Sequence, residues 1–121
     1  YMKENNRKKG ARKEAQAAAW LEGKGLQILE RNYRCKKGEI DLIAREKETY
    51  VFLEVKYRKG DGCGHPAEAV DERKQKRISG SALWYLAERG TLEAPCRFDV
   101  IAVDGEEGSV CWYRNAFDYR P

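Results

Sequence analysis

The sequence predicts an α/β fold in which a mixed central sheet is flanked by helices. Two stretches have helical periodicity, at residues 8–24 and 71–89, and strand-like stretches separate them and follow the second one. Three such stretches in a row favour an antiparallel meander, and the helix after them favours a crossover connection within the same sheet. The expected order of elements is therefore α-β-β-β-α-β, with a possible extra strand at the C-terminal end.

The first helix is expected over residues 8–24. Alanines recur along one stripe of this stretch, and Gly23 and Gly25 stop it. Glu14 lies one turn before Ala18, beside that stripe. Residues 1–7 are expected to form a disordered basic tail.

Three consecutive strands are expected after the first helix. Residues 36–38 have the composition of a tight turn, and residues 46–48 form a charged hairpin tip. The three strands are expected at residues 26–34, 39–45 and 49–58.

The second half of the chain begins with a glycine-rich loop at residues 60–64 and a possible short helical turn at residues 66–70. A long helix over residues 71–89 follows, with an apolar side and Gly90 as its stop. Residues 97–103 are expected to form a buried strand, and residues 110–114 a possible last one.

Composition is typical of one globular domain spanning residues 1–121. The chain is 41% hydrophobic and 36% charged, enough for a core of its own. No apolar run approaches the roughly 18 residues of a membrane span, and no signal-peptide pattern is present at the start. We therefore expect a cytoplasmic protein with no membrane partner, in which the four cysteines are reduced thiols.

The net charge of +4 is unevenly placed. Clusters of basic residues attract polyanions, of which nucleic acid is the usual one. Solvated faces and a loose tail explain such clusters equally well, so charge alone leaves both interpretations open. The clusters comprise Lys3, Arg7, Lys8, Lys9, Arg12 and Lys13; Arg34, Lys36 and Lys37; Lys56, Arg58 and Lys59; and Arg73, Lys74, Lys76 and Arg77.

The strand at residues 49–58 carries two charges in an otherwise apolar run. Side chains alternate across a strand, so Glu54 and Lys56 emerge on the same face. Charged groups rarely occupy such a position without a partner or a metal. A second acid, Asp41, lies in the preceding strand, and two acids with a lysine suit cleavage of a phosphodiester with Mg²⁺ or Mn²⁺.

Each residue of this cluster has an expected role. Asp41, Glu54 and the backbone carbonyl of Val55 are candidate metal ligands, and Lys56 is expected to orient the attacking water or neutralise the phosphate. A structural alternative stays open: Glu54 and Lys56 form a partly exposed pair near the strand end. Glu14 likewise is either a surface residue or reaches the metal site from the first helix.

Other polar residues divide between structure and binding. Asp99 is better explained as a buried acid, paired with Arg97 or with an arginine of a neighbouring strand, than as a catalytic group. Tyr57 and Arg58 flank Lys56 and are expected to contact nucleic acid. Basic residues near the first and second helices are expected to contact phosphates, and these are Arg12, Lys13 and Lys74.

Five motifs occur in a fixed order between about residues 10 and 103. They are N-Y-R, G-E-I-D-L-I-A, V-F-L-E-V-K-Y-R, E-A-V-x-x-x-K and R-F-D-V-I-A-V. In this set the chain resembles the YraN-like family of small bacterial proteins. That family is similar to the Holliday junction resolvases and to the PD-(D/E)xK nuclease superfamily, so the resemblance implies a restriction-endonuclease-like fold.

The resemblance also implies roles for particular residues. Asp41, Glu54 and Lys56 match the catalytic trio, Glu14 takes the place of the helix glutamate, and Lys74 falls where the family has another lysine. The expected function is a metal-dependent nuclease that acts on structured or branched DNA, with a homodimer as a possible assembly. The alternative is a non-catalytic module that keeps the nuclease fold to bind nucleic acid or protein.

Overall fold

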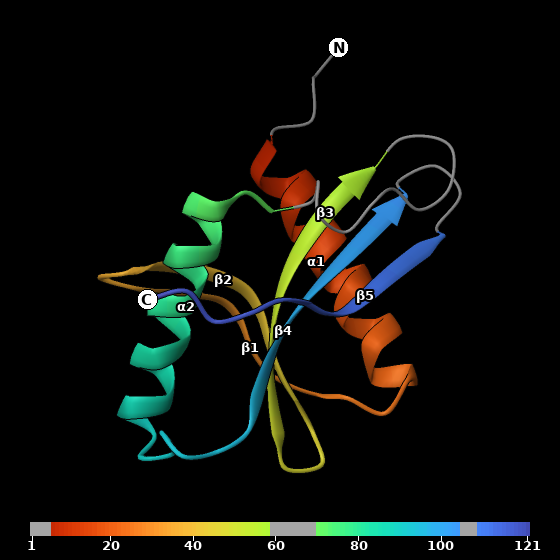
Figure 1. The fold of residues 1–121 in the computed structure, drawn as a ribbon. Coiled ribbons are helices and arrows are strands. Elements are labelled where there is room, and N and C mark those ends of the chain that lie inside the picture. Colours follow the sequence, from red (N-terminus) through yellow and green to blue (C-terminus); the bar gives the residue numbers. More distant parts are fainter. Residues whose placement is uncertain (1–5, 59–69, 105–108) are drawn as a thin grey trace.

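The computed structural model shows one five-stranded mixed sheet with a helix packed on each face (Figure 1). It describes residues 6–58, 70–104 and 109–121, and the side chains in these ranges except those of residues 6–11 and 58. The elements are α1 (Asn6–Gly23), β1 (Gln27–Cys35), β2 (Gly38–Glu46), β3 (Thr49–Arg58), α2 (Glu72–Glu88), β4 (Cys96–Asp104) and β5 (Val110–Phe117).

The sheet order follows the chain order. β1, β2 and β3 form an antiparallel meander, β4 runs parallel to β3, and β5 returns antiparallel to β4. The helix α2 makes the crossover between β3 and β4, as a parallel pair requires. The predicted mixed α/β sheet and the order α-β-β-β-α-β are confirmed, and the possible extra strand is present.

Two boundaries differ from the sequence predictions by more than one residue. The helix α1 begins at Asn6, so residues 6 and 7 belong to the helix instead of the predicted tail. The last strand runs to Phe117 instead of ending at residue 114. The remainder of the predicted tail, residues 1–5, and the predicted loop and turn at residues 60–69 lie outside the described residues.

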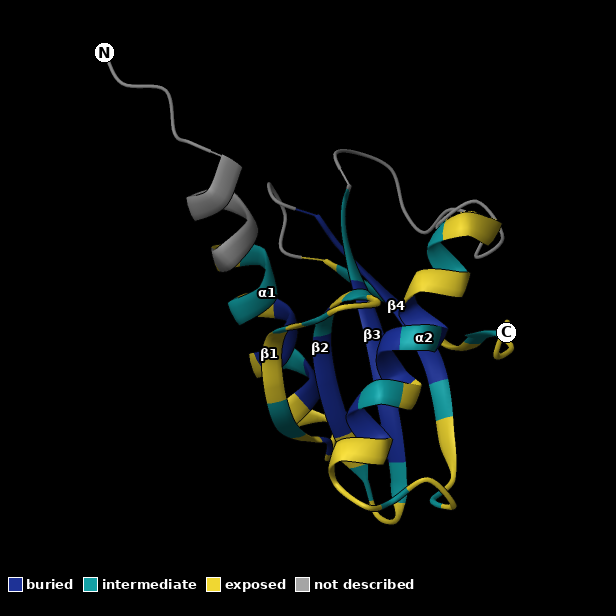
Figure 2. Cartoon of the chain, turned by 90° about the vertical axis from the view of Figure 1, so that its left-hand side faces the viewer, coloured by how far each residue is buried: buried dark blue, intermediate teal, exposed yellow. Residues whose placement is uncertain are grey.

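The alternation of β3 divides the core into two layers. Tyr50 and Phe52 face α2, where Ile78 and Tyr85 pack on them, while Val51 and Leu53 face α1. On the α1 side, the alanine stripe lets the helix approach closely, and Ala17, Ala18 and Leu21 are fully buried. Figure 2 shows β3 and β4 buried along most of their described length.

The start of α2 is fixed by a side-chain cap. Asp71 is its N-cap, and the Asp71 carboxylate accepts a hydrogen bond of 2.8 Å from the backbone N–H of Lys74. Such a cap satisfies a donor that the first helical turn leaves unpaired and contributes about 1 kcal/mol. The cap also fixes the backbone position from which the Lys74 side chain extends.

Asp99 is a structural acid, as the sequence indicated. Its side chain is fully buried and accepts hydrogen bonds from Arg97 Nε at 3.1 Å, Trp112 Nε1 at 2.9 Å and the backbone N–H of Asn115 at 2.8 Å. Because these donors come from β4 and β5, the buried carboxylate ties the edge strand β5 to the sheet.

The expectation of four reduced thiols holds only in part. Cys35 and Cys96 are free, but Cys111 in β5 is disulfide-bonded. Among the described residues, no helix is long and apolar enough to span a membrane.

Candidate functional site

The candidate site lies where β2 and β3 separate. Their antiparallel pairing runs from Glu46 and Thr49 to Leu42 and Leu53, and the regular register ends there. Beyond this point, the Asp41 carboxylate accepts a hydrogen bond of 2.8 Å from the backbone N–H of Val55. A side chain thus replaces the ladder bond, and this hydrogen bond holds Asp41 against the strand that carries Glu54.

Glu54 is buried on the α2 side of the sheet, with 6% of its surface exposed. Its Oε1 atom lies 2.7 Å from Nζ of Lys74, which reaches it from the first turn of α2. Burial, followed by the negative charge of Asp41, raises the pKa of Glu54 to about 7 even though Lys74 acts in the opposite direction. The ammonium of Lys74 therefore does not outweigh the combined effect of burial and of the Asp41 charge on Glu54.

The ion pair also affects Lys74. Burial alone would lower the pKa of the Lys74 ammonium, but the hydrogen bond and the charge of Glu54 outweigh burial and raise it. Lys74 therefore holds its proton more tightly than an ordinary lysine does. It contacts a carboxylate that also binds a proton more tightly than an ordinary glutamate does.

Glu14 joins the same cluster from α1. Its pKa is raised by burial and then by the charge of Asp41, and a hydrogen bond from the Asn32 side chain partly offsets both effects. Asp41 thus interacts with Glu14 on one side and with Glu54 on the other. Glu14 is half-buried beside Asp41 in the structure, whereas the sequence had left its position open.

Asn32 is the site residue that sequence reasoning missed. It has a positive φ of 54°, a conformation that asparagine tolerates better than most residues, and its neighbours in β1 pair with residues 40 and 42 on either side of Asp41. Its position at the head of the N-Y-R motif was the available signal, but nothing in the sequence connected it to the acids.

Lys56 and the nucleic-acid candidates lie further along β3. Lys56 is half-buried, two residues beyond Glu54. The Lys13 ammonium lies over the ring of Tyr57, 3.5 Å from its centroid, so these two predicted contacts interact with each other across α1 and β3. Arg12 is exposed on α1, and the side chain of Arg58 lies outside the described residues.

The donor atoms at this site fit a hard divalent cation. Across the described ranges, no group of three or more His, Cys, Asp or Glu side chains is arranged so that it could hold a metal ion. Mg²⁺ does not need such a group, because it keeps several waters and is usually bound through one or two carboxylates. Asp41 and Glu54 supply two carboxylates, and the raised pKa of Glu54 indicates that a further positive charge would stabilise the ionised pair.

Comparison with known proteins shows relatives along most of the chain. The model of a family described as "Uncharacterised protein family UPF0102" matches residues 13–103. A UPF0102 protein of Geotalea uraniireducens is 48% identical over 99 residues, which cover 82% of this chain and 78% of the relative. A UPF0102 protein of Lachnoclostridium phytofermentans is 47% identical over 115 residues, with 94% and 96% covered.

Among solved structures, SfsA of Pyrococcus furiosus in complex with Ca²⁺ matches with a TM-score of 0.36 and 14% identity. The match covers 86% of this chain and 61% of that chain.

Proposed function

We propose that this chain, which belongs to the protein family UPF0102, is a metal-dependent nuclease. It would hydrolyse phosphodiester bonds in structured or branched DNA. The observation that carries this proposal is the convergence of Asp41 and Glu54 at the point where β2 and β3 separate. Glu54 is buried and its pKa is raised, and a cation bound beside Asp41 and Glu54 would offset the negative charge of the two carboxylates.

In this proposal Asp41 and Glu54 hold Mg²⁺ or Mn²⁺, with the carbonyl of Val55 as a third donor. When bound, such a cation polarises the phosphate and offsets the negative charge that develops on its oxygens. The backbone N–H of Val55 keeps the Asp41 carboxylate oriented. Glu54, which contacts Lys74 in this structure, would hold the cation together with Asp41.

The remaining polar groups act on the substrate. Lys56 lies on the same face of β3 as Glu54, where its ammonium orients the attacking water or neutralises the phosphate. Glu14, which holds a proton more readily than a surface glutamate does, is placed to exchange a proton near Asp41. The hydrogen bond from Asn32 fixes the Glu14 carboxyl relative to the sheet.

The finer parts of the proposal come from the resemblance to the YraN-like proteins and to resolvases. They are a restriction-endonuclease-like fold, a place in the PD-(D/E)xK superfamily, action on DNA in the cytoplasm, and assembly as a homodimer. The five-stranded mixed sheet with a helix on each face is compatible with this fold.

The test is a cleavage panel of branched and linear DNA with Mg²⁺ or Mn²⁺. Asp41→Asn and Glu54→Gln should each abolish metal-dependent cleavage, whereas Glu93→Gln, which changes an exposed glutamate far along the chain, should not. Equal cleavage by the wild type and the two site variants would assign the activity to a contaminant.

Calorimetric titration with Mn²⁺ separates the nuclease from a non-catalytic module of the same fold. The nuclease should bind one or two ions, on the usual pattern of such sites, at a site that Asp41→Asn removes. A wild-type chain that shows no heat of Mn²⁺ binding would favour the non-catalytic module.

A further inference from the structure

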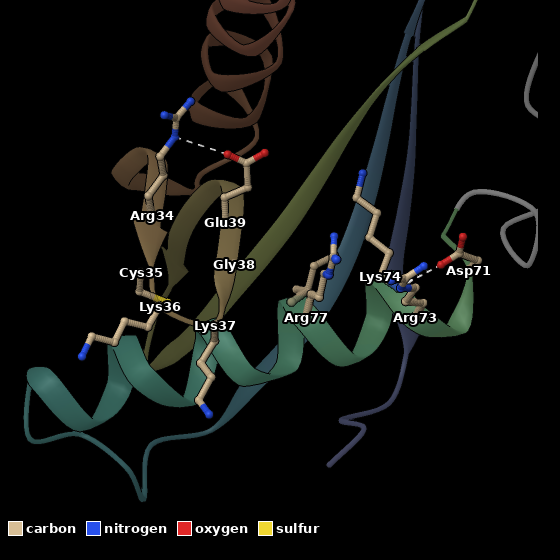
Figure 3. Close-up of a pocket in the computed structure, with 11 residues that line it drawn as sticks. Arg34, Cys35, Lys36, Lys37, Gly38, Glu39, Asp71, Arg73, Lys74 and Arg77 are labelled. Atoms are coloured by element: carbon tan, nitrogen blue, oxygen red, sulfur yellow. Dashed lines mark hydrogen bonds and ion pairs between the residues drawn. The ribbon is translucent and has the colours of Figure 1, made fainter.

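A groove of about 930 Å³ lies between the turn that joins β1 to β2 and the first half of α2 (Figure 3). Most of its lining residues are basic, and two are acidic. We call it the basic groove and define it by its six cationic residues, which are Arg34, Lys36, Lys37, Arg73, Lys74 and Arg77.

We propose that the basic groove binds the phosphate backbone of a double-helical arm of nucleic acid and directs it toward the carboxyl pair Asp41 and Glu54. The inference rests on the proposed function in one respect, the assignment of nucleic acid as substrate. Beyond that function, it assigns the binding surface to the basic groove and the form of the bound nucleic acid to a double helix.

The charge of the groove favours a polyanion. Both acids already have partners, because Glu39 lies 3.3 Å from Arg34 and Asp71 caps α2. Within the described part of the chain, no ion pair involves Lys36, Lys37, Arg73 or Arg77, and all four are exposed. Six basic groups against two acidic ones give this groove a positive excess as large as the net +4 of the whole chain.

The two walls of the groove are held at a fixed distance. A Cβ atom at Gly80 in α2 would lie 3.3 Å from Cβ of Lys37, so the turn packs on the helix at a position without a side chain. Gly38 has a φ of 147°, and a Cβ there would lie 3.3 Å from Oγ of Ser81. At the far end of α2, the Tyr33 hydroxyl donates a hydrogen bond of 2.7 Å to Glu88. The basic groups are therefore preorganised, which lowers the cost of binding.

The lining of the groove favours a duplex over a single strand. Proteins that bind single strands combine a basic groove with aromatic side chains on which bases stack. The described lining of the basic groove contains no aromatic residue. Cations without stacking platforms contact the phosphate backbone, which a double helix presents on its outside while its bases are paired.

Lys74 connects the basic groove to the candidate site. It lines the groove and also lies 2.7 Å from Glu54. A phosphate backbone bound in the groove would therefore contact the same lysine that contacts Glu54 of the carboxyl pair.

The experiment compares two double variants that remove the same charge. Lys36→Ala with Arg73→Ala removes one cation from each wall, and both residues are exposed. Arg31→Ala with Lys76→Ala is the matched control, because these exposed residues lie in β1 and α2, next to the two walls, but do not line the groove. Binding of a fluorescent duplex and of a single strand of equal length is measured by anisotropy at several salt concentrations. EDTA is present throughout, so that hydrolysis contributes nothing, and thermal unfolding checks that both variants are folded.

The groove variant should bind duplex at least about tenfold more weakly at moderate salt, and the slope of log affinity against log salt should fall by about two, near one per lost phosphate contact. The control should stay close to the wild type, and the wild type should prefer duplex to single strand. Equal losses in both variants, a preference for single strand, or binding of anionic lipid vesicles but not duplex would each overturn the inference. Duplex binding through the groove without any cleavage would refute the proposed nuclease and leave this inference standing.

Discussion

Replacing Glu54 with glutamine should change how the stability of the protein depends on pH. Glu54 has an ordinary pKa of 4.5 that burial and Asp41 raise to about 7 in the folded chain. The folded state therefore binds this proton more tightly than the unfolded state does. The associated stability is fully present below about pH 4.5 and is lost as the pH rises toward 7.

The magnitude follows from the size of that shift. One pKa unit corresponds to about 1.4 kcal/mol, so the free energy of unfolding should fall by about 2 to 3 kcal/mol between pH 5 and pH 8 through Glu54. Solvent screens this effect little, because the Glu54 side chain is only 7% exposed. Glu54→Gln cannot ionise and should lack this part of the pH dependence.

The assay is urea unfolding of the wild type, Glu54→Gln and Glu93→Gln at pH 5 and pH 8 in EDTA. The difference between the two pH values cancels effects of each substitution that do not depend on pH. The wild type and Glu93→Gln should lose more stability than Glu54→Gln does over this interval. If all three lose the same amount, Glu54 titrates like a surface glutamate, and Glu54 is not a buried acid that interacts with Asp41.

Three other substitutions or additions test separate parts of the molecule. Mn²⁺ at about a hundred times its dissociation constant should raise the free energy of unfolding of the wild type by about 2.7 kcal/mol and that of Asp41→Asn hardly at all; equal shifts in calorimetric melting would place the ion elsewhere. Gly38→Ala should cost about 1 to 3 kcal/mol, because its φ is 147° and its Cβ position is crowded. Gly23→Ala, with nothing within 4 Å, should be nearly neutral in the same urea titration. Asp99→Ala should cost about 3 to 5 kcal/mol because it leaves Arg97 Nε, Trp112 Nε1 and the backbone N–H of Asn115 without their acceptor; a loss no larger than that of the exposed Asp118→Ala would contradict the buried network.

The extent of prediction from sequence differs between the fold and the site. The period of the apolar residues determined that Glu54 lies on the same face of its strand as Phe52, and the structure has both on the side of α2. The same pattern predicted every helix and strand of the described chain, with small errors at Asn6 and Phe117. Asp99 was interpreted correctly because a buried acid two residues from an arginine on one strand has an obvious local partner.

Contacts between distant parts of the chain could not be obtained in this way. The pair of Lys74 with Glu54 joins residues from α2 and β3, and the contact of Glu14 with Asn32 joins α1 to β1. Neither is encoded by a local period, because each depends on how a helix is docked on the sheet and where a ladder stops. The same holds for the basic groove. Its two walls form because Gly38 and Gly80 allow the turn between β1 and β2 to pack closely on α2.

The sequence by itself determined the order of elements, the face of β3 on which Glu54 emerges and the uneven placement of positive charge. These properties follow from side-chain periodicity and composition, which act over a few neighbouring residues. Only the tertiary structure decided that β2 and β3 part at Asp41, that three carboxyls interact there, and that Lys74 lies between them and a groove of basic residues. Those outcomes depend on packing across the sheet, where burial and nearby charge set the pKa of Glu54.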